Sequence, residues 1–99
     1  MKTMVETWLK GQFGDDAELL ESVYGEYRQT LAGLLDDLSA AMAAADRERI
    51  DRTLHTIKGS AAMVGDAETS SLAQAARALT DEAALRAAAS RLRALCAAL

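Results

Sequence analysis

The sequence has no proline, one cysteine, one histidine, and only one tryptophan, two tyrosines and one phenylalanine among its 99 residues. Without proline, nothing interrupts a long helix by removing a backbone donor. A single cysteine excludes an internal disulfide and is typical of a reducing compartment, so we expect a cytoplasmic protein. Cys96 lies in an apolar C-terminal stretch, where we expect it to pack as a small hydrophobic residue.

Other absences exclude whole classes of function. The sequence contains no glycine-rich phosphate loop of the Walker type and no cluster of residues at metal-ligand spacing, so we expect neither ATP binding nor a metal or other cofactor. The net charge is −4, with acidic and basic residues interspersed, which gives no basis for nucleic-acid binding. No apolar run approaches 18 residues, and the N-terminus lacks a secretory signal, so we expect no membrane association.

The residues that are abundant favour helices. Hydrophobic residues make up 51% of the chain, and alanine, leucine, arginine and glutamate are strong helix formers. We therefore predict a single all-α domain over residues 1–99, and we expect it to be a monomer. Short connections between the helical segments predict an antiparallel up-down-up-down four-helix bundle with a short extra N-terminal helix.

The short first helix is predicted over Thr3–Lys10, with Gly11 and Gly14 ending it. We expect it to cover one end of the bundle, with Trp8 as a packing residue. The four longer segments are predicted from Asp15 or Asp16 to about Ala45, from Asp46 to about Val64, from Asp66 or Thr69, and from about Glu82 to Ala98. Gly65 fits the left-handed position that ends a helix.

Apolar residues at spacings of three and four mark the buried faces of these segments. In the second segment they are Leu20, Tyr24, Tyr27, Leu31, Leu34, Leu38 and Ala41, with Leu35 and Met42 beside them. In the third they are Ile50, Leu54, Ile57, Ala61 and Val64. In the fourth they are Leu72, Ala76 and Leu79, flanked by Ala73 and Ala75. In the fifth they are Leu85, Ala88 or Ala89, Leu92, Leu95 or Cys96, and Leu99.

The only histidine, His55, lies on the exposed side of the third segment. At 100° per residue, its side chain points roughly 140° away from the centre of the apolar stripe. Lys58, Gly59 and Ala62 follow at positions that are neighbours on a helix surface. A glycine one turn from an exposed histidine leaves the imidazole accessible to another protein. Lys58 could partly neutralise a phosphoryl group on the ring, which would carry about two negative charges.

The stretch HTIKGSAAMVG, residues 55–65, resembles the signature of histidine-containing phosphotransfer (HPt) domains. That signature reads roughly His-x-Leu/Ile-Lys-Gly-Ser/Ala-Ser/Ala, followed by an apolar residue and glycine. The matching residues are His55, Ile57, Lys58, Gly59, Ser60, Ala61, Val64 and Gly65. The length and helix layout of the chain are also similar to those of the family.

The resemblance implies a phosphorelay carrier. The phosphorylated residue would be His55, with Lys58 neutralising charge and Gly59 giving steric access, while Asp51, Arg52 and Ala62 would help to dock the partner. The phosphoryl group would come from an aspartate on the receiver domain of a hybrid sensor histidine kinase and pass to the receiver of a response regulator. Any Mg²⁺ would belong to the receiver. Such a carrier has no ATP-dependent kinase activity of its own.

One departure concerns what orients the imidazole. Phosphotransfer domains of chemotaxis kinases carry a glutamate on the next helix for this purpose, whereas the corresponding region here offers Gln74, Arg77 and Asp81. We therefore favour the general HPt family. Two alternatives remain: a non-catalytic helical adaptor that uses another surface, and an inhibitory HPt-like protein that binds a kinase or receiver without transferring phosphate.

Overall fold

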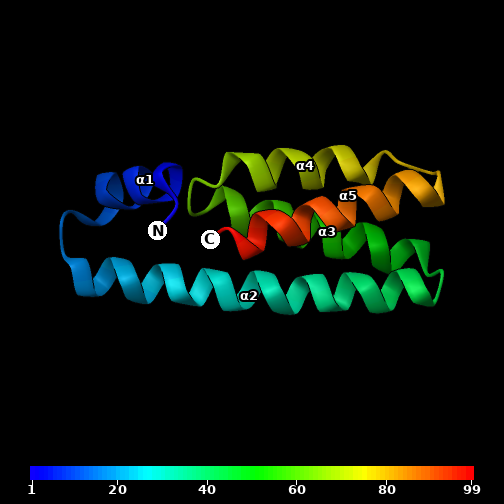
Figure 1. Cartoon of the computed structure of the whole chain (residues 1–99), viewed down its shortest axis with the longest axis horizontal. Helices are drawn as coiled ribbons and strands as arrows, with labels where there is room; N and C mark the ends of the chain where they lie inside the picture. The colour runs from blue at the N-terminus through cyan, green and yellow to red at the C-terminus, as the bar shows by residue number, and fades with distance from the viewer.

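The computed structural model describes all 99 residues as five helices and no strands. They are α1 (Thr3–Phe13), α2 (Ala17–Ala43), α3 (Arg47–Ala62), α4 (Ala67–Arg77) and α5 (Glu82–Ala97). Helices α2 to α5 run alternately in opposite directions, and α1 folds back over the first turns of α2 (Figure 1). This confirms the predicted antiparallel four-helix bundle with a short extra N-terminal helix.

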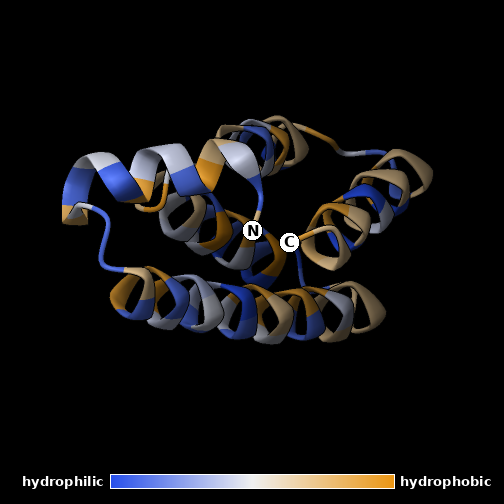
Figure 2. Cartoon of the chain, turned by 60° about the vertical axis from the view of Figure 1, so that its left-hand side comes forward, coloured by the Kyte–Doolittle hydropathy of each residue, from blue (hydrophilic) through white to orange (hydrophobic).

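Helices α2 to α5 surround one interior, and each contacts two neighbours (Figure 2). The molecule is elongated, measuring 43 × 20 × 19 Å along its principal axes. None of the five helices is long and apolar enough to cross a membrane. The apolar stripe predicted for the third segment is confirmed, since Ile50, Leu54, Ile57, Ala61 and Val64 are all buried. The side of α3 opposite this stripe is therefore free to carry the functional residues.

Several details of the predicted faces and boundaries were wrong. Leu35, not Leu34, occupies the buried seam of α2, with Leu34 half-buried beside it. In α4 the buried alanines are Ala73 and Ala76, whereas Leu72 is half-buried and Ala75 is exposed; Leu79, just after the helix, is also half-buried. In both helices, adjacent apolar residues allow two interpretations of the same periodicity, and only packing against the neighbouring helices selects one.

Helix α1 continues through Gly11 to Phe13, past its predicted end at Lys10. Gly11 has no tertiary contact that forces a turn, so its low helix propensity alone does not end the helix. The predicted ends of the second, third and fifth helices also lie one or two residues too late. This difference is within the range over which helix ends fray.

Aspartates begin four of the five helices. The carboxylates of Asp16, Asp46, Asp66 and Asp81 each accept a hydrogen bond from the backbone N–H three residues later. Each satisfies a donor that the first turn leaves unpaired, and each places negative charge at the positive end of the helix dipole. These four caps fix where the long helices start and therefore set the register between them.

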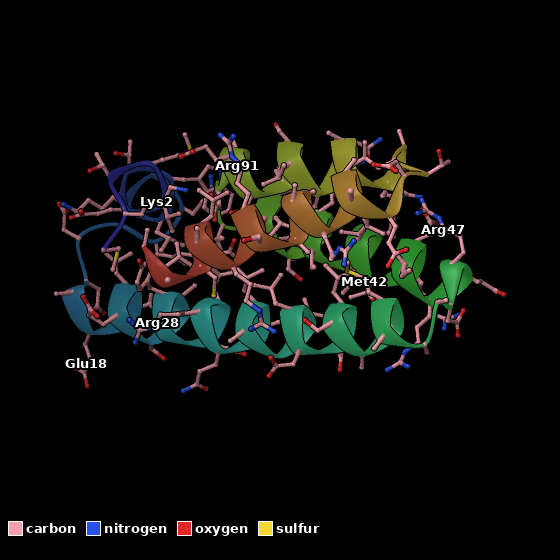
Figure 3. The ribbon with its side chains drawn as sticks, turned by 45° about the vertical axis from the view of Figure 1, so that its right-hand side comes forward. Lys2, Glu18, Arg28, Met42, Arg47 and Arg91 are labelled. Carbon is pink, nitrogen blue, oxygen red and sulfur yellow. The ribbon has the colours of Figure 1, made fainter.

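Helix α1 is attached to the bundle by both apolar and polar contacts. Val5 and Leu9 are completely buried, and Trp8 packs, half-buried, against the core as predicted. The Lys2 ammonium lies 2.9 Å from the buried Asp66 carboxylate and 3.2 Å from Glu68. Figure 3 shows Lys2 at this end of the molecule. The predicted role of α1 as a cover over one end of the bundle is therefore confirmed.

The two chain ends meet at Tyr24. Its hydroxyl donates a hydrogen bond to the Leu99 carbonyl and accepts one from the Lys2 N–H. Nearby, Cys96 is half-buried against the core, and burial raises the pKa of its thiol. Cys96 is therefore a packing residue, as the sequence predicts, with little thiolate character.

Candidate functional site

His55 lies in the middle of α3 with its imidazole exposed to solvent. Gly59, one turn later, is also exposed, and a Cβ placed on it would meet no atom within 4 Å. Ala62, a further turn along, is exposed as well. Because residues at these spacings share one side of a helix, the surface beside the ring consists of small residues. A protein surface could therefore approach the imidazole closely.

Lys58 lies half-buried on the same face, and none of the six ion pairs in the molecule includes it. Its charge is therefore available to an incoming anion. Its backbone carbonyl accepts a hydrogen bond from Ser70 Oγ of α4 at 3.1 Å. This bond supplies a donor to a carbonyl near the end of α3 and ties the two helices together at the level of the site.

Arg77, at the end of α4, contacts the imidazole directly. Its Nη1 lies 3.1 Å from His55 Nδ1. The same guanidinium forms a two-point ion pair with Asp51, with Nε 3.0 Å from Oδ1 and Nη2 3.4 Å from Oδ2. Arg77 thus joins the histidine to a carboxylate one turn earlier on α3. The sequence could not select it from Gln74, Arg77 and Asp81, and its role was missed.

The contact with Arg77 selects one tautomer of the neutral ring. Arginine has only donors, so Nδ1 must accept. In the neutral imidazole the other nitrogen, Nε2, then carries the proton. Because Nδ1 is occupied by Arg77, Nε2 is the ring nitrogen that can react, once it has lost this proton.

Asp51 and Arg77 stabilise each other's charged forms. The hydrogen bond from Arg77 lowers the pKa of Asp51 and, reciprocally, Asp51 raises the pKa of Arg77. Both side chains are partly exposed, at 45% and 29%, so the pair contributes modestly to stability. Its main consequence is geometric, because a guanidinium held at two points has little freedom to leave the ring.

Arg47 holds the end of α4 in place from the first turn of α3. Its Nη1 and Nη2 donate to the carbonyls of Leu79 and Arg77, both at 2.8 Å. Figure 3 shows Arg47 at the end of the bundle where α3 begins. These carbonyls have no partner within the helix, so a cation here both caps the helix and complements its dipole. The backbone of Arg77 is thereby fixed relative to α3.

A polar cluster around Asp66 fixes the other end of the α3–α4 pair. The carboxylate is completely buried and accepts hydrogen bonds from Tyr27 at 2.6 Å, Thr69 Oγ1 at 2.7 Å and Lys2 at 2.9 Å. Burial opposes its ionisation, but these hydrogen bonds outweigh burial and hold the pKa of Asp66 below its usual range. Burial, followed by the Asp66 carboxylate, raises the pKa of Tyr27. The charged carboxylate is thus a fixed part of the α3–α4 turn.

The site residues predicted from the sequence differ in their exposure and in their contacts. His55, Gly59, Ala62 and Arg52 are exposed, and Lys58 is half-buried beside them. Arg52 makes only a loose contact with Glu48, at 4.0 Å. Asp51 instead faces Arg77, which gives it a defined partner within the chain. The sequence did not single out Met63, which is 74% exposed at the far end of the same helix.

Comparison with known proteins agrees with this arrangement. The sequence model of the Hpt domain family matches residues 22–99, which include α3, α4 and α5 and all but the first turn of α2. No curated protein and no solved structure matches the chain significantly. Members of the Hpt family transfer phosphoryl groups through a histidine in two-component phosphorelays and interact there with receiver domains. Since the match covers well over half of the sequence, the chain belongs to the Hpt domain family.

Proposed function

We propose that this protein is a phosphoryl carrier in which Nε2 of His55 accepts the group from a receiver-domain aspartate and passes it to a response-regulator aspartate. The observation that carries the proposal is the free Nε2 of an exposed imidazole whose other nitrogen is held by Arg77 at 3.1 Å. A group fixed on one side and exposed on the other is pre-positioned for attack on a docked partner.

In the accepting step, Nε2 loses the proton that it carries in this tautomer, and its electron pair attacks phosphorus to form an N–P bond. The P–O bond of the receiver's aspartyl phosphate breaks, and its electron pair returns to the aspartate carboxylate. The proton of the neutral ring is released to solvent. The donating step is the reverse reaction on a second receiver, so the carrier itself is unchanged after a complete cycle.

The surroundings of His55 support a division of labour between the carrier and its partners. No group of three or more histidine, cysteine or carboxylate side chains in this chain could hold a metal ion. We propose that a Mg²⁺ ion on the receiver supplies most of the stabilisation of the transferring phosphoryl group. The carrier would contribute the nucleophile and the ammonium of Lys58, whose positive charge favours the phosphorylated ring.

We further propose that the receiver docks over the face formed by Gly59, Ala62 and Arg52. The small residues give close access, and the guanidinium of Arg52 is exposed and loosely held. Met63 is exposed on the same side of α3 and offers an apolar contact at the edge of this face. We place the protein in the cytoplasm and expect it to act as a monomer.

The test is phosphoryl transfer from a panel of receiver domains, each labelled on its aspartate, to wild type and to His55→Gln. The proposal predicts label on wild type that survives base, is lost in acid and is absent from the variant. If receivers bind but transfer no label, the inhibitory HPt-like alternative is favoured. Absence of both label and binding would favour a helical adaptor that uses another surface.

A further inference from the structure

The unusual feature of the site is the hydrogen-bond partner of His55 Nδ1. This partner, the Arg77 guanidinium, is a permanent cation that has no hydrogen-bond acceptor. A carboxylate in this position would accept a hydrogen bond from Nδ1–H, and an amide could either donate or accept one. Arg77 can only donate, and Asp51 holds it in place with bonds of 3.0 and 3.4 Å. We propose that Arg77 is a positioning residue that keeps Nδ1 of phosphorylated His55 unprotonated and thereby prolongs the lifetime of the phosphohistidine. This inference rests on the proposed function of His55.

The chemical reason lies in how the N–P bond of phosphohistidine breaks. In hydrolysis, water attacks phosphorus, the P–Nε2 bond breaks, and its electron pair goes to the ring. When Nδ1 already carries a proton, the ring leaves as neutral imidazole. When Nδ1 is unprotonated, the leaving ring must become an imidazolate or obtain a proton during the step. Protonation of Nδ1 is therefore what makes phosphohistidine labile in acid.

Arg77 competes directly for the lone pair that this proton would occupy. The phosphorylated ring has an acceptor on Nδ1, so the 3.1 Å contact can persist after phosphorylation. A proton on Nδ1 would break this hydrogen bond and place two cations side by side. The carboxylate of Asp51 favours a positively charged ring, but it is already engaged by Arg77. Protonation of Nδ1 would therefore require the contact with Arg77 to be broken.

Other charged groups also lie on the two helices that carry the site. On α3 these are Arg52 and Lys58, and Arg47 acts on Asp51 from the first turn. On α4 the charged group that reaches the ring is Arg77. The three additional cations also disfavour a protonated phosphorylated ring. None of them donates a hydrogen bond to Nδ1, so the effect of Arg77 should be separable from theirs.

The experiment uses the protein phosphorylated on His55 with phosphoramidate, a small phosphoryl donor that requires no receiver. Its hydrolysis is followed between pH 4 and 9 in wild type, Arg77→Ala, Arg77→Lys and Arg77→Gln. We expect Arg77→Ala to shorten the half-life near neutral pH by about three- to tenfold, since one partly exposed charge-assisted hydrogen bond is lost. At low pH, where Nδ1 is protonated in every variant, the rates should converge.

The conservative variants separate positioning from a structural role. Lysine is also a donor-only cation, so Arg77→Lys should retain most of the wild-type profile, whereas glutamine should give an intermediate one. Arg91→Ala is the charge-matched control, since Arg91 is exposed on α5 and forms no ion pair; its profile should equal that of wild type. Nitrogen-15 NMR of the phosphorylated ring should show Nδ1 protonating at lower pH in wild type than in Arg77→Ala.

The proposal is overturned if Arg77→Ala remains folded by thermal unfolding and its hydrolysis profile and Nδ1 protonation coincide with those of wild type. A longer half-life in Arg77→Ala would overturn it as well. Both results concern the lifetime of a chemically formed phosphohistidine and leave transfer from receivers unaffected. Failure of this inference is therefore distinguishable from failure of the proposed function.

Discussion

The indole of Trp8 in α1 occupies the space that a side chain on Gly65 would need. A Cβ placed on Gly65 would lie 2.7 Å from Trp8 Cδ1, with Cβ and Cγ of the same side chain closer still. Gly65 also has a φ of +72°, and its N–H and that of Asp66 bond back to the carbonyls of Ala62 and Ala61. This is the Schellman arrangement that ends α3. Glycine is therefore required here both by backbone conformation and by close packing.

Replacing Gly65 by alanine should destabilise the protein by about 2–4 kcal/mol, measured by urea denaturation. A left-handed alanine contributes about 1–2 kcal/mol and overpacking against Trp8 the remainder. In a Trp8→Ala background the same substitution should cost distinctly less, because only the backbone effect remains. Equal costs in both backgrounds would show that the indole does not restrict this position.

Ala45 provides the opposite case. It ends α2 in the same arrangement, with the N–H of Asp46 bonded to the Ala41 carbonyl at 3.0 Å, but at a φ of +52° without being glycine. Ala45→Gly should therefore raise the free energy of unfolding by about 1 kcal/mol. The control is Ala44→Gly, where φ is −82° and no strain is relieved. A loss of stability in Ala45→Gly would contradict this interpretation.

Substitutions at Gly59 should affect stability and phosphoryl transfer differently. A Cβ there meets nothing within 4 Å, so Gly59→Ala should raise stability by up to about 1 kcal/mol through helix propensity. A longer side chain beside His55 should obstruct the receiver, so Gly59→Gln should slow transfer from a receiver roughly 10- to 100-fold. Phosphorylation by phosphoramidate, a small molecule, should be nearly unaffected.

Gly33 offers a matched control for this experiment. It is exposed in α2, and a Cβ on it also meets nothing within 4 Å. Gly33→Gln should therefore alter stability much as Gly59→Gln does, while transfer from the receiver stays at the wild-type rate. If both variants slowed transfer equally, the effect would be a general one, and the steric role of Gly59 would be wrong.

The buried Asp66 should make stability depend on pH in acid. Its pKa is lowered in the folded state, so its contribution is present above the unfolded value near 3.9 and is lost as pH falls through the lower folded value. Asp66→Asn should cost about 1–3 kcal/mol at pH 7, because donors from Lys2, Tyr27 and Thr69 would face an amide. It should also flatten the decline in stability below about pH 4.

Asp51→Asn is the comparison for this acid effect. The pKa of Asp51 is also lowered, by Arg77, but the pair is partly exposed, so this variant should change the acid decline much less. Denaturant unfolding at a series of pH values from 2.5 to 7 measures both. An undiminished acid decline in Asp66→Asn would show that other groups are responsible.

The sequence predicted the elements of the fold well because local signals determine them. The apolar stripe from Ile50 to Val64 and the capping aspartates required no knowledge of neighbouring helices. Where two adjacent apolar residues fitted the same periodicity, as with Leu34 and Leu35, the prediction was wrong, since the choice depends on packing between helices. The prediction that α1 ends before Gly11 was also wrong, because the low helix propensity of one glycine is not enough to end the helix.

In the candidate site, too, local features could be predicted from the sequence and contacts between helices could not. The accessible histidine and the small residues beside it follow from spacing along one helix, and the exposure of His55, Gly59 and Ala62 agrees with that expectation. Arg77 could not be selected, because its approach to His55 depends on the register between α3 and α4. That register is set by the turn at Asp66, by the Ser70–Lys58 bond and by Arg47, which are contacts between distant residues.

We propose that a single residue, His55, carries a phosphoryl group between two receivers. The most direct measurement mixes a receiver labelled on its aspartate with a second, unlabelled receiver and this protein, and follows the label over time. We predict that label reaches the second receiver with wild type, passes through a base-stable and acid-labile intermediate on the carrier, and fails to move with His55→Gln. Transfer that proceeds equally well with His55→Gln would show that His55 is not the carrier.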